Sequence, residues 1–298
     1  MEHSDYPALY QAADDTSQGG QKTYKRLVGV DLSLVVVGAV LGTLAFLVPR
    51  AYAAAFAAAA AIVLLGSIVT KFVARQRSDD KEWFDGRAVA ESVKSLTWRY
   101  MMRLKPFRDD ATCDQKFVGE LEAILKARSS LHYRVGASSS TEQITPRMRE
   151  VRQLPVVQRR DLYVKQRLEE QANWYGDKAE DNRVLANRLF WASLAAQFVA
   201  LALAVWRVVL PSAGLSLVGA VLALAAAFTA WAQLGRHDEL SKSYALARQE
   251  LLSIKALANT LDTEQELAKI VRDGEGAISR EHTMWIAKRG EPLPQQAS

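Results

Sequence analysis

The chain has 298 residues, of which 49% are hydrophobic and 24% are charged, and its formal net charge is +5. Its mean hydropathy is −0.07, the average expected when one part of a chain is lipid-embedded and another is strongly charged. The single cysteine, Cys113, excludes an intrachain disulfide and a cysteine-clustered zinc site. No two of the four histidines have helical metal-ligand spacing, so we expect neither a metal nor a cofactor.

The N-terminal residues 1–21 are polar and poor in aliphatic side chains. They include the pairs Asp14–Asp15 and Gly19–Gly20, a composition that predicts a disordered leader. We do not expect a signal peptide. The leader contains acidic residues, the apolar run after it is too long, and a second apolar run follows at once.

Two pairs of apolar runs predict an all-α integral membrane protein with two transmembrane hairpins and four crossings. The first pair, about residues 30–48 and 52–73, is separated by a Pro-Arg turn at residues 49–50. The second pair, about residues 189–209 and 213–234, has its own proline at the tip. Each run is about 20 residues long, the length that a helix needs to cross the hydrocarbon core.

Basic residues flank the open ends of both hairpins, whereas the tips carry only Arg50 and Arg207. By the positive-inside bias, both tips are outside the cell and the two termini are cytosolic. The flanking basic residues are Lys22, Lys25, Arg26, Lys71, Arg75, Arg77, Lys178, Arg183, Arg188, Arg236 and Lys242.

The crossings contain few polar residues, and these are the candidates for lining a pore because polar groups that face lipid are costly. Asp31 lies near the cytosolic boundary, where helix capping or pairing with Arg26 is favoured over ion coordination. Gly38 and Gly42 form a GxxxG pair, which predicts a close helix contact. The candidate pore-lining residues are Asp31, Thr43, Ser193 and Gln197.

After each hairpin, apolar residues recur at three- and four-residue spacing and predict long cytosolic helices. No proline occurs between Lys71 and Pro106, so the second crossing is expected to continue as one helix to Pro106. Aromatic and basic residues form stripes on these helices, for which packing against a neighbouring helix is favoured over a ligand site. The stripe residues are Trp83, Arg87, Lys94, Trp98, Tyr163, Arg167, Trp174, Tyr244, Arg248 and Lys255.

The two halves of the chain align at a constant offset of 161 residues, which places Arg87 on Arg248 (248 − 87). The shared pattern R-x4-S-[V/I]-K-x-L follows each hairpin, and the hairpins themselves superpose without a gap. A tandem duplication explains this agreement. Both copies enter and leave the membrane on the same side, so the repeat is parallel rather than inverted.

The domain boundaries follow from this repeat. The first copy is expected at residues 22–133 and the second at residues 147–290. Between them, residues 134–146 contain a glycine and a run of serines and are expected to form a flexible linker. The polar tail, residues 291–298, is expected to be disordered.

Four motifs resemble those of two fused SLATT domains, the two-helix membrane modules associated with the SMODS and SLOG nucleotide-signalling proteins of bacteria. The motifs are WRYMMRLKPF (98–107), RMREVR (147–152), Y-x3-R-x3-Q-x2-WY (163–175) and E-x3-W (281–285). The resemblance implies a pore-forming effector of bacterial conflict systems, located in the plasma membrane. A partner would sense the nucleotide-derived signal that activates it, and no catalytic residues are implied.

Two hypotheses for function remain. No GxSxG, P-loop, GxGxxG or HExxH motif is present, so an enzyme is not expected. A transporter would need more polar groups near mid-membrane. We favour a permeabilising effector that is a homo-oligomer, because one subunit with four crossings lacks a wide polar lumen. The alternative is a non-conducting membrane scaffold or sensor whose cytosolic helices bind partners. Nucleic acid is not an expected partner.

Overall fold

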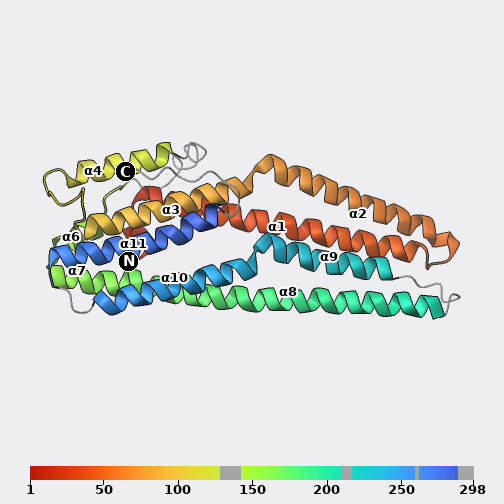
Figure 1. Cartoon of the computed structure of the whole chain (residues 1–298). Coiled ribbons are helices and arrows are strands. Elements are labelled where there is room, and N and C mark those ends of the chain that lie inside the picture. The colour runs from red at the N-terminus through yellow and green to blue at the C-terminus, as the bar shows by residue number, and fades with distance from the viewer. Residues whose placement is uncertain (128–141, 210–216, 259–261, 288–298) are drawn as a thin grey trace. The chain divides into compact units, whose positions relative to one another are not determined.

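The computed structural model describes residues 1–127, 142–209, 217–258 and 262–287 (Figure 1). Within these ranges every regular element is a helix, which confirms the all-α class. The elements are η1 (His3–Asp5), α1 (Ala8–Ala45), α2 (Arg50–Arg77), α3 (Asp79–Met101), α4 (Cys113–Lys126), α6 (Pro146–Gln153), α7 (Val156–Tyr163), the π-helix η3 (Val164–Glu169), α8 (Glu170–Val209), α9 (Val218–Gly235), α10 (His237–Ala258) and α11 (Glu264–Ala287).

Four helices are long and apolar enough to cross a membrane, and they confirm the two predicted hairpins. The first hairpin is formed by α1 and α2, and the second by α8 and α9. The expected tip of the second hairpin, at Pro211, lies outside the described residues. In the first hairpin, Pro49 is the N-cap of α2 with φ −52°. Proline suits this position because its φ is already close to helical and a helix start does not need its missing N–H.

The chain divides into two compact units. We call residues 22–79 and 180–241 the membrane unit, and residues 1–21, 80–179 and 242–298 the globular unit.

Large apolar side chains are exposed on the membrane unit. The exposed fractions of Ile62, Phe198 and Val208 are 70%, 62% and 80%. Such a surface would be unfavourable in water and suits contact with lipid. Within the unit the hairpins also contact each other, because a Cβ built on Gly29 of α1 would lie 3.6 Å from the Trp231 ring of α9.

The helix after each hairpin is a separate element, so the expected single helix to Pro106 is wrong. Ser78 is left-handed, with φ 52°, and separates α2 from α3. Arg236, with φ 49°, separates α9 from α10 in the same way. One left-handed residue ends the hydrogen-bond ladder of a helix. No glycine or proline marks the break at Ser78 in the sequence, whereas Gly235 directly precedes the break at Arg236. The two breaks are 158 residues apart (236 − 78), three fewer than the repeat offset.

The N-terminal segment is folded, which corrects the expectation that residues 1–21 are disordered. It contains η1 and the first turns of α1, and Tyr6, Leu9 and Ala13 are 4%, 3% and 0% exposed. A Cβ on Gly86 of α3 would lie only 2.8 Å from the carbonyl oxygen of Ala13, so the two helices nearly touch. Small residues permit this close approach, and burial against α3 supplies the apolar contact that the segment's composition did not indicate.

The core of the globular unit is rich in aromatic residues. Trp98, Phe107, Phe117 and Tyr163 are all 0% exposed. Tyr100 packs on Phe117 with ring centroids 4.8 Å apart. Most of the expected linker (residues 134–141) and the whole tail (residues 291–298) lie outside the described residues.

Candidate functional site

The polar groups of the first hairpin tie its two helices together. Ser67 of α2 donates a hydrogen bond of 2.5 Å to Asp31 Oδ1 of α1. Lys71 Nζ lies 3.7 Å from Asp31 Oδ2, so the ion pair of this acid is with Lys71 and not with Arg26 as expected. Asp31 therefore has a local structural partner on each of its oxygens.

The second hairpin holds a ladder of polar side chains between α8 and α9. The Ser193 and Thr229 hydroxyl oxygens are 2.9 Å apart, and Ser193 also donates to the Ala225 carbonyl at 3.2 Å. Gln197 Nε2 donates to Ser193 Oγ at 3.4 Å. Ser193 is buried, whereas Gln197 is exposed beside a cavity of about 570 Å³. The amide of Gln197 thus ends the ladder on an open face of the membrane unit.

The four candidate pore-lining residues do not form one surface within the subunit. Ser193 and Gln197 are in contact, but Asp31 belongs to the first hairpin. The Thr43 hydroxyl donates to the Ala39 carbonyl of its own helix at 2.8 Å, which satisfies it locally. Of the four, Gln197 is the one that is exposed.

Only the first glycine of the GxxxG pair makes a tight helix contact. A Cβ on Gly38 would lie 2.7 Å from Leu64 Cδ2 of α2. A Cβ on Gly42 would have no atom of the described residues within 4 Å, so the expected contact at Gly42 is not present among them.

This difference makes a direct comparison of two variants informative. Gly38→Leu should force α1 and α2 apart and destabilise the hairpin by about 1–3 kcal/mol, the usual cost of overpacking. Gly42→Leu serves as the matched control and should leave the melting temperature of the purified protein in detergent unchanged. An equal effect of the two substitutions would contradict the described packing of the hairpin.

Arg167 forms the most deeply buried ion pair of the globular unit. Its side chain is 1% exposed, and it donates from Nε and Nη2 to Glu275 at 3.0 and 2.8 Å. Ser95 and Tyr163 also donate to this carboxylate, at 2.5 and 3.1 Å. Burial alone would lower the pKa of Arg167, but the Glu275 carboxylate raises it above its ordinary value. The guanidinium is therefore charged at all physiological pH values.

A second buried contact involves Trp98, whose Nε1 donates to the Tyr6 hydroxyl at 3.2 Å. Burial raises the pKa of Tyr6 to about 12, so the phenol is neutral and can accept this bond. Lys94 Nζ lies 5.7 Å from the centre of the Tyr6 ring. Burial also lowers the pKa of Lys94.

The remaining stripe residues make contacts within the globular unit, although Trp174 and Arg248 are exposed. Tyr244 stacks on Tyr175 with centroids 5.6 Å apart, and Arg87 lies over the Trp174 ring at 5.8 Å. Lys255 Nζ is 3.2 Å from the Glu169 carboxylate. Trp83 is 6% exposed. The Arg248 side chain lies against Gly176.

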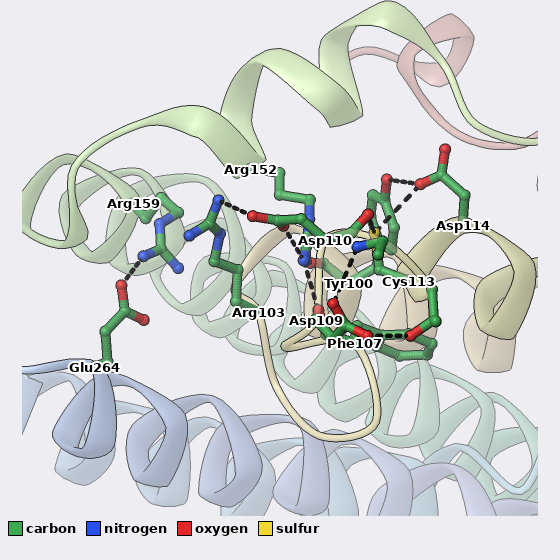
Figure 2. Close-up of polar contacts among 12 residues, drawn as sticks. Tyr100, Arg103, Phe107, Asp109, Asp110, Cys113, Asp114, Arg152, Arg159 and Glu264 are labelled. Atoms are coloured by element: carbon green, nitrogen blue, oxygen red, sulfur yellow. Dashed lines mark hydrogen bonds and ion pairs between the residues drawn. The ribbon is translucent and has the colours of Figure 1, made fainter.

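The sequence motifs around residues 98–107 and 147–152 meet at Arg152, which sequence reasoning did not single out (Figure 2). Its guanidinium donates to the carbonyl oxygens of Tyr100 and Phe107 at 2.7 and 2.6 Å and to Asp110 at 2.7 Å. The loop after α3 is thus held to α6 by one buried arginine. The only signal in the sequence was the presence of basic residues in both motifs.

Comparison with known protein families identifies the two domains of the chain. Residues 7–160 match the model of the SMODS and SLOG-associating 2TM effector domain 3, SLATT_3. Residues 163–285 match that of the SMODS and SLOG-associating 2TM effector domain 1, SLATT_1. The chain belongs to the SLATT family. No curated protein and no solved structure matches it.

Each SLATT domain contains one hairpin, so the protein is a multi-pass membrane protein made of two tandem two-helix effector domains. The first domain begins inside the supposed leader, at residue 7. The two matches meet between residues 160 and 163, and not in the stretch 134–146 that was expected to separate the repeats.

The two SLATT domains share the buried network of the globular unit. Ser95 and Trp98 belong to the first domain, whereas Arg167 and Glu275 belong to the second. Because Ser95 and Arg167 both bind Glu275, the contacts of this carboxylate join the domains. The E-x3-W motif lies in α11, beyond the last residue whose side chain is described.

Proposed function

We propose that this SLATT protein is an effector of a bacterial conflict system that oligomerises and permeabilises the plasma membrane. A partner that senses a nucleotide-derived signal would activate it, and both termini would lie in the cytosol. The single observation that carries the proposal is Gln197, a polar residue that is exposed on a predominantly apolar crossing. The proposal includes no catalytic activity.

The position of Gln197 in the crossing suits the wall of a polar lumen between subunits. It lies eight residues after Leu189, the first residue of the apolar run, and therefore about 12 Å along the crossing. The amide donates one bond, to Ser193 Oγ, and its remaining donor and its oxygen would be costly in hydrocarbon at this depth unless they find a polar partner or water. Association of several copies around this face would place a polar partner or water beside the amide. Association would also supply the lumen that a single subunit with four crossings lacks.

The alternative of a non-conducting scaffold is less well supported. That hypothesis relied on the aromatic stripes as partner-binding surfaces. Trp83, Trp98, Tyr163 and Tyr244 are instead 0–6% exposed and pack within the globular unit. A partner would have to bind elsewhere on the protein.

The proposal is tested by ion leakage from liposomes that contain the purified protein, and by membrane depolarisation on induced expression. We expect the wild-type protein to conduct. Gln197→Leu should reduce leakage at least tenfold without changing the oligomer, because it removes the polar end of the ladder. Phe198→Leu is the matched control, since Phe198 is exposed on the same helix and apolar.

Two results would count against a pore. One is a wild-type oligomer, correctly inserted, that neither leaks in liposomes nor depolarises cells even when its activating partner and signal are present. The other is equal leakage by the wild type and by Gln197→Leu, which would remove the residue on which the proposal rests.

A further inference from the structure

The globular unit contains a cavity of about 460 Å³ that the proposed pore does not use. Its walls come from the N-terminal segment, from α3 and from residues 166–174, all of which lie in the globular unit. The volume is within the range of small-molecule sites in proteins. The two SLATT domains both contribute walls, the first through residues up to Lys94 and the second from Gln166 onwards.

Arg167 supplies a buried donor at this cavity that has no acceptor. Its Nε and Nη2 bind Glu275, but Nη1 is buried and has no hydrogen-bond partner among the described residues. A guanidinium N–H is always charged and cannot accept a hydrogen bond, so leaving it unsatisfied in the interior is unfavourable. An acceptor oxygen of a ligand would satisfy it.

Lys94 places a second, partly buried cation on the same wall. Its ammonium lies over the Tyr6 ring, and it forms no ion pair with any carboxylate in the described part of the chain. Burial lowers the pKa of this ammonium, whereas the nearby carboxylates of Glu91, Asp14 and Glu275 act in the opposite direction. An anionic ligand group between Lys94 and Arg167 would favour the charged form of the lysine further.

Aromatic rings line the rest of the cavity. Trp83 and Trp174 both contribute to its walls, and Trp174 is 37% exposed. The Arg87 guanidinium lies over the Trp174 ring at 5.8 Å, so this wall combines a flat apolar surface with a cation. Such a surface suits a planar ring, which stacks on tryptophan and on arginine.

Acidic side chains narrow the class of ligand further. Asp14 and Glu91 also line the cavity, and an ionised carboxylate only accepts hydrogen bonds. They would accept from sugar hydroxyls and would repel a ligand with many negative charges. We propose that this cavity binds a nucleoside monophosphate, with its phosphate at Arg167 and Lys94 and its base against Trp174. The chain would then receive a small-molecule signal directly, whether or not its membrane unit conducts.

Binding is measured by isothermal titration of the full-length protein in detergent with AMP, GMP, CMP and UMP. At least one of the four should bind and raise the melting temperature, because a ligand that binds only the folded state stabilises it. The matching free nucleoside and inorganic phosphate should each bind at least tenfold more weakly, since each lacks half of the contacts. No binding by any of the four nucleotides up to millimolar concentration would overturn the proposal. Phosphate or nucleoside that binds as tightly as the nucleotide would overturn it as well.

Lys94→Met locates the site. It should weaken nucleotide binding at least tenfold without lowering the melting temperature of the empty protein, because it replaces a partly buried cation with an apolar chain of similar length. Lys116→Met, at an exposed lysine outside the cavity, should bind like the wild type. Unchanged affinity in Lys94→Met would place any binding elsewhere and overturn the assignment. Liposome leakage is measured separately, so a failure of binding is distinguished from a failure of the pore.

Discussion

Arg167→Met is expected to lower the free energy of unfolding of the globular unit by about 3–5 kcal/mol, because it leaves a buried carboxylate without its counter-ion. Glu275 is 5% exposed, so water cannot replace the guanidinium. The hydroxyls of Ser95 and Tyr163 would still donate to Glu275, but neither carries a charge. The loss is measured by thermal and chemical unfolding of the purified protein in detergent, followed by circular dichroism.

Two comparisons separate charge from packing. Arg183→Met removes an ion pair whose partners are more than half exposed, and should cost about 0–1 kcal/mol. The double variant Arg167→Met, Glu275→Met removes both buried charges and should regain much of the lost stability. If the double variant were as unstable as Arg167→Met alone, the buried charge would not be the cause.

Trp98→Ala is expected to cost about 3–5 kcal/mol, since it empties the space of a large side chain that is 0% exposed. It also leaves the Tyr6 hydroxyl without the bond from the indole N–H. Tyr6 belongs to the N-terminal segment, so the substitution should loosen that segment as well. Faster proteolysis within residues 1–21 would reveal this second effect.

Trp174→Ala is the matched control for Trp98. Trp174 is 37% exposed, and its removal leaves a space that water can enter, so a smaller loss is expected. Equal melting temperatures for Trp98→Ala and wild type would show that Trp98 is not in the core. Melting is best followed by circular dichroism, because both substitutions change the intrinsic fluorescence.

Local composition was enough to locate the four crossings and the tandem arrangement. Whether a stretch enters lipid depends on the summed transfer free energy of about 20 consecutive residues, and this sum can be read from the sequence. Each predicted apolar run, such as residues 30–48 in α1, therefore lies in a helix that is long and apolar enough to cross a membrane. Two predictions were wrong because local composition does not report contacts between distant residues or the end of a helix at an ordinary residue. The N-terminal segment is folded by contacts with α3, and Ser78 ends a helix without a glycine or proline to mark it.

The polar contacts of the candidate sites depended on the tertiary structure. Ser95 and Glu275 are 180 residues apart and share a hydrogen bond, and Tyr6 and Trp98 are 92 apart. The sequence by itself determined which helices cross the membrane, how many there are and to which family they belong. Only the tertiary structure decided that Arg167 pairs with Glu275, that Gln197 reaches an open face, and that Lys94 and Arg167 line one cavity. Hydropathy is additive along the chain, whereas the partner of a buried charge is set by the packing of distant helices.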